Sequence, residues 1–189
     1  MIDSVEKLNE CLQLEKKMCI DNGYKGKLHS WITSCEIGKI AQYLEVLRKD
    51  EYYTNIKSKS IFNKLKNIYY RRKHNKLGWK LGISIPVNTF GKGLMIYHSQ
   101  GIIVHKDVRC GCFCKLHGLT CIGNKGVEEE GRTTPVLGDR IDIGVGAEII
   151  GPIILADDIK IAAGAVVCRS CGSKGVILAG VPAKIKENS

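Results

Sequence analysis

The hydrophobic positions in the second half of the chain recur at a period of six. Six aliphatic residues follow one another at this step without a gap: Leu137, Ile143, Ile149, Leu155, Ile161 and Val167. Small or aliphatic residues lie four positions after five of them: Ile141, Ala147, Ile153, Ile159 and Ala165. A helix buries residues three or four apart, and a plain strand buries alternate residues. The period of six therefore predicts short strands joined by tight corners, three to a coil, in a parallel solenoid.

Two shorter runs with the same step precede this series. They are Phe90, Ile96 and Ile102, followed by Val104, Cys110, Leu116 and Ile122. The step is interrupted between residues 102 and 104, and again by the segment NKGVEEEGRTTP at 124–135. We expect this insertion to loop out of the solenoid, where loops commonly carry functional residues.

The earlier part of the chain has a helical period instead. Apolar residues three or four apart predict helices over 4–20, 33–50 and 59–77, with Ser4 as the N-cap of the first. The dipeptide Leu77-Gly78 predicts the end of the third helix. The apolar residues of that helix are predicted to form one buried stripe: Ile61, Phe62, Leu65, Ile68, Tyr69 and Tyr70.

The change of period near residue 81 predicts a chain of two parts. Residues 1–80 are expected to form an N-terminal α-helical region, and residues 81–189 a mainly β domain of stacked coils. Each coil alone would be unstable, because its backbone hydrogen bonds run to the neighbouring coils.

Composition and charge narrow the class of protein. Hydrophobic residues make up 44% of the 189 residues and charged residues 25%, which excludes wholesale disorder. No apolar run approaches the ~18–20 residues of a membrane span, and no secretion signal is visible, so we expect a cytoplasmic location. The net charge of +10 is concentrated at 57–76, which holds eight basic residues and no acidic one. Such a segment could bind nucleic acid, an anionic membrane or an anionic substrate. We favour the simpler interpretation, in which it is the solvated face of a helix and binds no nucleic acid.

The nine cysteines do not form a metal-binding pattern. Without a secretion signal they are expected to be free thiols. Cys168 and Cys171 form a single CxxC pair, whereas a zinc site needs four ligands and a second pair at a suitable spacing. We therefore expect no metal.

The hexapeptides, the stretch LGISIPVNTFGKGLMIYHSQGIIV at 81–104 and the closing AGVPAK at 179–184 resemble the hexapeptide-repeat acyltransferases. Within that group they are most similar to the serine acetyltransferases. The resemblance covers about residues 81–185. It implies a left-handed parallel β-helix, a homotrimer or a dimer of trimers, and acetyl-CoA as the acyl donor.

The resemblance assigns catalysis to a histidine. His98, in the stretch IYHSQG, matches the catalytic histidine of the family. A hydroxyl acceptor is a poor nucleophile at neutral pH, and an imidazole can remove its proton as the oxygen attacks a thioester. His117, in a neighbouring repeat, is a second candidate for the same cleft.

The donor side of the resemblance rests on four further residues. Asn124, Val145 and Ala163 match positions whose main-chain groups line the pantetheine in the family. Lys184 matches a basic residue near the phosphates of CoA.

Three departures from the family pattern concern the acceptor. Ser84 stands where the family has the aspartate that orients the histidine, Tyr97 replaces an aspartate, and Thr134 replaces a second histidine. The acidic run Glu128–Glu130 is expected to be a solvated loop, and the alternative is that one of its carboxylates reaches His98. Ser84 and His117 resemble the branch associated with capsule and exopolysaccharide gene clusters.

The combined expectation is an acetyl-CoA-dependent O-acetyltransferase that acts on a hydroxyl, with a surface-polysaccharide sugar as the favoured acceptor. A serine O-acetyltransferase in cysteine biosynthesis is the first alternative. An inactive solenoid scaffold is the second.

Overall fold

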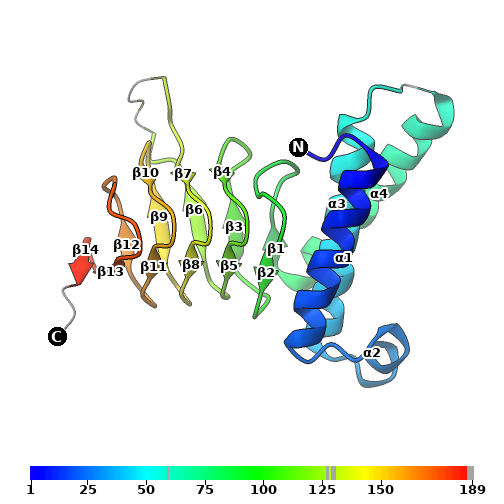
Figure 1. The fold of residues 1–189 in the computed structure, drawn as a ribbon, viewed down its shortest axis with the longest axis horizontal. Helices are drawn as coiled ribbons and strands as arrows, with labels where there is room; N and C mark the ends of the chain where they lie inside the picture. The colour runs from blue at the N-terminus through cyan, green and yellow to red at the C-terminus, as the bar shows by residue number, and fades with distance from the viewer. Residues whose placement is uncertain (59, 127, 129–130, 187–189) are drawn as a thin grey trace.

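In the part of the chain that the structure describes, four helices lead into a row of stacked coils (Figure 1). The computed structural model describes residues 1–58, 60–126, 128 and 131–186. The helices are α1 (Val5–Asp21), α2 (Lys27–Thr33), α3 (Glu36–Asn55) and α4 (Ile61–Leu81). Within the described part of the chain, no helix combines the length and the apolar character needed to cross a membrane.

The helix boundaries agree with the sequence in some places and differ in others. Ser4 is the N-cap of α1 as predicted, and its hydroxyl accepts a hydrogen bond from the backbone N–H of Lys7 at 3.3 Å. The hydrophobic pattern gives no signal for α2, which has only seven residues. The predicted stop at Gly78 is wrong, because α4 continues to Leu81 and ends at Gly82 with φ 64°. Gly78 is needed for packing, since a Cβ there would lie 2.5 Å from the carbonyl oxygen of Ile83.

The strands that follow are two to four residues long and form three sheets. The first sheet contains β1 (Ile83–Ser84), β3 (Ile102–Val104), β6 (Cys121–Gly123), β9 (Glu148–Ile150) and β12 (Val166–Val167). The second contains β4 (Arg109–Cys110), β7 (Val136–Leu137) and β10 (Ile154–Leu155). The third contains β2 (Met95–Ile96), β5 (Lys115–Leu116), β8 (Asp142–Ile143), β11 (Lys160–Ile161), β13 (Ile177–Gly180) and β14 (Ala183–Lys186).

The strand pairing confirms the predicted parallel coil. Leu137 pairs with Leu155, and Ile143 with Ile161, so one coil takes 18 residues, or three steps of six. All named pairings are parallel except that of β13 with β14, which closes the C-terminal end as an antiparallel hairpin. The coil that contains the insertion is longer, because Leu116 pairs with Ile143, 27 residues later.

The interior of the coils is built from the predicted positions. All the residues that follow the step of six from Leu137 to Val167 are buried, as are the five that lie four positions after them. Their side chains form one continuous apolar cluster that extends into the helical region as far as Tyr43 and Cys19. The helices therefore cover the first coil and share its core.

A buried ion cluster holds the helices to the first coil. Arg48 on α3 is 1% exposed and binds Glu15 on α1 at 2.7 Å and Glu51 on its own helix at 2.8 Å. Its guanidinium also donates to the backbone carbonyls of Phe90 and Gly91. The arginine thus joins α1, α3 and the solenoid by charge-assisted hydrogen bonds.

The predicted buried stripe of α4 is wrong. Five of its six residues are more than half exposed: Ile61, Phe62, Leu65, Ile68 and Tyr69. The face of α4 that packs on α3 carries polar groups instead. There, His74 lies between the buried carboxylate of Asp50 and the hydroxyl of Tyr43, each at 3.0 Å. Because these polar groups are paired with one another, burying them costs little, and the apolar side of the helix is left outside.

The nine cysteines are free thiols, as predicted. Among the residues that the structure describes, no group of three or more His, Cys, Asp or Glu side chains is arranged to hold a metal ion.

Candidate active site

His98 lies at the corner that follows β2 and leads into β3. Its side chain is 64% exposed, so the imidazole faces solvent in the single chain. The next coil is close, because a Cβ added at Gly118 would lie 3.6 Å from the Cβ of His98 and 2.9 Å from the carbonyl oxygen of Ser99. Glycine at 118 therefore lets the two corners approach each other.

A carboxylate from the helical region approaches His98. Glu36 is the first residue of α3, and its Oε2 lies 3.5 Å from Nδ1 of His98. Its Oε1 accepts hydrogen bonds from the backbone N–H and the hydroxyl of Ser99, both at 2.7 Å. These two hydrogen bonds, with a smaller contribution from His98, lower the pKa of Glu36 below its usual value. The carboxylate is therefore held ionised and turned toward the imidazole.

Sequence reasoning missed Glu36. It lies 62 residues before His98 and carries no motif, so only the packing of α3 on the first coil brings the two together. The acidic run proposed for this role is only partly described, because Glu129 and Glu130 lie outside the described residues.

His117 lies one coil further along and has its own partners. Its ring stacks on that of Tyr97, with centroids 4.7 Å apart and 10° between the planes. Its Nε2 is 3.4 Å from Oδ1 of Asp142. The backbone holds this stack, because the N–H of Tyr97 donates to the carbonyl of Leu116 at 2.9 Å. Each histidine thus faces a different carboxylate.

Two of the predicted donor-side residues share the corner of His98. Ile96, Leu116, Ile143 and Ile161 pair in register along the third sheet. Two residues further on, each coil reaches this corner at His98, Gly118, Val145 and Ala163. Val145 and Ala163 are exposed. They form a line of small side chains that runs from the histidine along the edge of the solenoid.

The other two donor-side residues lie elsewhere on the chain. Asn124 follows β6 of the first sheet, so it occupies a different corner. Lys184 is exposed on β14, at the end of the third sheet furthest from β2. One chain therefore brings together His98, Val145 and Ala163, and leaves Asn124 apart.

The positions that depart from the family pattern have structural explanations in part. Thr134 is 5% exposed, and its hydroxyl donates to the backbone carbonyl of Asp107 at 3.0 Å. This threonine is therefore a buried anchor for the inserted segment. Ser84 is exposed on β1, where it borders a cavity of about 600 Å³ between α3, α4 and the first sheet.

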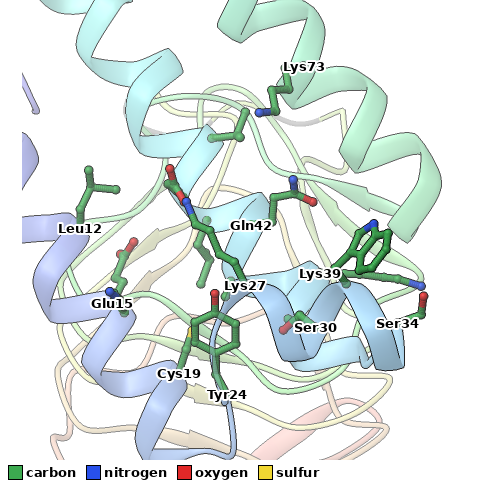
Figure 2. A pocket seen from close by; sticks show the side chains of 17 residues that line it. Leu12, Glu15, Cys19, Tyr24, Lys27, Ser30, Ser34, Lys39, Gln42 and Lys73 are labelled. Atoms are coloured by element: carbon green, nitrogen blue, oxygen red, sulfur yellow. The ribbon is translucent and has the colours of Figure 1, made fainter.

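A larger cavity of about 670 Å³ lies among the helices (Figure 2). Leu12, Cys19 and Tyr24 contribute to its wall, and Lys27 enters from α2 to pair with Glu45 at 3.1 Å. His98, Val145 and Ala163 are not among its lining residues. The corner of His98 is therefore separate from this cavity, and its exposed side chains lie on an open edge of the solenoid.

Comparison with curated proteins finds similarity to serine acetyltransferases. The enzyme of Helicobacter pylori is 39% identical over 88 residues, which are 46% of this chain and 50% of the relative. That of Buchnera aphidicola from Acyrthosiphon pisum is 30% identical over 144 residues, 75% of this chain and 49% of the relative. The chain thus spans about half the length of these relatives. No protein-family profile matches it.

Solved structures share the whole arrangement of helices and coils. A serine acetyltransferase from Neisseria gonorrhoeae aligns with a TM-score of 0.69 and 21% identity, over 97% of this chain and 66% of that chain. A serine acetyltransferase in complex with CoA aligns with a TM-score of 0.70 and 20% identity, over 96% of this chain and 71% of that chain. At these identities the likeness shows the fold alone.

Proposed function

We propose that this chain is an acetyl-CoA-dependent O-acetyltransferase in which His98 is the general base. One observation carries the proposal: His98 stands at the head of the line formed with Val145 and Ala163, with Nδ1 turned toward Glu36. If Nδ1 donates its proton to that carboxylate, Nε2 keeps a lone pair that faces solvent. A base, an orienting carboxylate and an open edge for a donor then meet at one corner.

The chemistry follows from these roles. His98 would take the proton of the acceptor hydroxyl through Nε2 as the oxygen attacks the thioester carbonyl. The imidazolium would then return that proton to the departing thiolate, so the histidine ends the cycle unchanged. Glu36 acts through the histidine as a positioning residue, since a carboxylate beside Nδ1 holds the ring and favours its charged form.

The edge of the solenoid fits an extended thiol-bearing donor. Val145 and Ala163 project little, and a Cβ added at Gly164 beside Ala163 would meet nothing within 4 Å. From β2 to β13 the third sheet spans four strand spacings of about 4.8 Å each, or roughly 19 Å. Lys184 on the strand after β13 would then lie near the phosphates at the far end of such a donor.

L-Serine is the first acceptor to test, because the curated relatives are named serine acetyltransferases. A small amino-acid hydroxyl is therefore better supported than the sugar favoured by the sequence alone. A sugar hydroxyl remains the second candidate for one reason. The ring of Tyr97, stacked on His117, offers an aromatic surface next to His98 on which the C–H face of a sugar packs.

We also infer that three chains, each with a left-handed coil, assemble around the candidate site. Ile103 and Leu119, near the corner of His98, are apolar and 57% and 63% exposed, so a second chain would cover them. The same assembly would bring Asn124, from another corner of a neighbouring chain, toward the groove. A helical region at 1–80 and an acyltransferase domain at 81–189 remain the proposed division of the chain.

The test is release of free thiol from acetyl-CoA, with L-serine and a panel of sugars as acceptors. We expect His98→Ala to lower kcat by about 10²–10⁴ and to leave CoA affinity nearly unchanged. His29→Ala is the control, because this histidine lies on α2 and belongs to neither the corner of His98 nor that of Asn124. An unchanged rate in His98→Ala would refute the role of the histidine. Absence of both turnover and CoA binding would favour the inactive scaffold.

A second variant separates orientation from structure. Glu36→Gln is expected to lower kcat by a smaller factor than His98→Ala and to leave the KM for acetyl-CoA unchanged. Glu36→Asp keeps the charge and should recover part of the rate. An equal loss in both Glu36 variants would indicate that the residue is structural.

A further inference from the structure

The outward face of α4 carries a row of large apolar side chains. Their exposed fractions lie between 56% and 90%: Ile61, Phe62, Leu65, Ile68, Tyr69 and Trp79. The largest patches on ordinary monomers are often functional, and scattered single residues are not. Here the side chains follow one another along a single helix of 21 residues.

The two opposite sides of α4 differ in what they contact. At 100° per residue, the side facing α3 carries Asn67, Tyr70, His74, Leu77 and Leu81. About 180° away lie Ile61, Leu65, Ile68, Arg72, Lys76 and Trp79. The inward face is closed by hydrogen bonds such as those of His74 with Asp50 and Tyr43. The apolar row therefore cannot turn inward without leaving these polar groups unpaired.

Positive charge accompanies the apolar row. α4 holds seven Lys and Arg residues and no Asp or Glu. Arg72 and Lys76 lie within the apolar row itself, and Lys64 and Lys80 lie toward its two edges. Long basic side chains can lay their methylene stems along apolar surface while the charged ends reach outward.

We propose that α4 docks on the surface of an anionic lipid bilayer and lies in its plane. Ile61, Leu65, Ile68 and Trp79 would enter the boundary between headgroups and acyl chains, and the basic residues would contact lipid phosphates. Exposed apolar side chains with Lys and Arg beside them supply the two contributions that hold a helix on such a surface, which are buried apolar area and attraction to anionic lipids. The apolar contact would be made by residues 61–69 and by Trp79, with the cations Arg72 and Lys76 between them. The proposal is independent of the acetyltransferase activity.

Two other occupants fit the face less well. A second copy that placed its own α4 against this one would oppose seven cations to seven, with no acidic residue on either helix to offset them. Nucleic acid would use the cations but has no site for Ile61, Leu65 and Ile68, which are aliphatic and exposed. An anionic bilayer uses both the charge and the apolar side chains.

The first experiment is co-sedimentation of the full chain with vesicles at low salt. We expect binding to vesicles of equal phosphatidylglycerol and phosphatidylcholine, and none to phosphatidylcholine alone. The triple variant Phe62→Ser/Leu65→Ser/Ile68→Ser should bind at least tenfold more weakly. Arg72→Gln/Lys76→Gln should lose about fivefold for each cation. These side chains face outward, so circular dichroism and the melting temperature should be unchanged.

Matched controls lie on α1 and in the connection that follows it. Ile20 is 51% exposed, so Ile20→Ser removes an outward apolar side chain from another helix. Lys17→Gln/Lys25→Gln removes two exposed cations near the same helix. Neither control should change vesicle binding. Equal losses in the controls and the α4 variants, or no binding of the unmodified chain, would overturn the proposal.

The second experiment locates the contact by fluorescence. The chain has two tryptophans, Trp31 and Trp79, so Trp31→Phe leaves Trp79 as the only reporter. We expect its emission to shift to the blue with anionic vesicles and to be quenched by brominated acyl chains. The variant Trp79→Phe leaves Trp31 as the reporter. A blue shift in that variant, and none in Trp31→Phe, would contradict docking through α4. Sedimentation velocity gives a second contradicting outcome. The unmodified chain would form an assembly and not bind vesicles, and the triple variant would lose that assembly.

Discussion

Replacing Arg48 by methionine tests the buried cluster that joins the helices to the first coil. The guanidinium is 1% exposed and lies between two carboxylates, Glu15 and Glu51, that are themselves 4% and 3% exposed. Methionine fills a similar space without charge. Arg48→Met therefore leaves two buried carboxylates without a cation, and the carbonyls of Phe90 and Gly91 without a donor.

The expected loss is large for one side chain. Removing one partner of a buried ion pair costs about 3–5 kcal/mol, and each carbonyl that loses its donor adds about 1 kcal/mol or less. We expect the free energy of unfolding to fall by about 4–6 kcal/mol, out of a total of about 5–15 kcal/mol for a domain. Arg140→Met, which breaks an exposed pair with Asp158, should have a much smaller effect.

Urea unfolding at one protein concentration, followed by circular dichroism, measures both variants. A further variant, Arg48→Met/Glu15→Gln/Glu51→Gln, also replaces the two buried carboxylates that Arg48→Met leaves without a cation. Its amides still accept the backbone N–H groups of Leu94 and Asn88 that the carboxylates accept now. We expect it to be more stable than Arg48→Met by about 2 kcal/mol, because the charges act as a unit. A loss below about 2 kcal/mol in Arg48→Met, or a less stable triple variant, would refute this account of the cluster.

Three further predictions follow from single residues. Gly78→Ala should lower the melting temperature, although alanine normally stabilises a helix by about 1 kcal/mol, because its Cβ would meet the carbonyl of Ile83. Hydrogen bonding with Thr33 and Ser30 lowers the pKa of Cys35, whereas burial raises that of Cys11 to about 12. Peptide mapping after brief treatment with iodoacetamide at pH 8 should therefore find Cys35 modified and Cys11 intact. Because the pKa of Glu36 is lowered in the folded chain, its carboxylate stabilises the fold above the usual carboxyl pKa, and this contribution is lost as the pH falls through the lower pKa of the folded state. The deficit in melting temperature of Glu36→Gln should therefore shrink as the solution is acidified.

The coil was predictable because its signal is periodic and its environment is uniform. Each of Leu137, Ile143 and Ile149 meets the same constraint, a single inward side chain per short strand, so the sequence repeats the same choice. The 18-residue coil length then follows from three steps of six. The hydrophobic pattern does not record the local contacts that set the ends of helices. The predicted helix ended too early because a glycine is a usual stop signal, whereas Gly78 is there to allow close packing against Ile83.

α4 misled the sequence argument for a physical reason. An amphipathic pattern identifies two faces, and the usual inference buries the apolar one. That inference fails where the polar face is satisfied by other protein groups. Asp50 is 0% exposed and binds both His74 and Arg71, so these polar side chains of α4 have a partner on α3. Such a network is invisible in the sequence, because its members come from two helices.

The candidate site was also predictable only in part. His98, Val145 and Ala163 were assigned through the resemblance to a family, and the 18-residue coil explains why Val145 and Ala163 lie in one column. Glu36 could not be assigned in this way, because its position depends on how α3 meets the first coil. The family position for an orienting carboxylate holds Ser84, yet a carboxylate is present at Nδ1 of His98 from another element. Loss of a residue from a motif therefore does not establish loss of its chemical role, and in this chain the helical region would supply part of the catalytic corner.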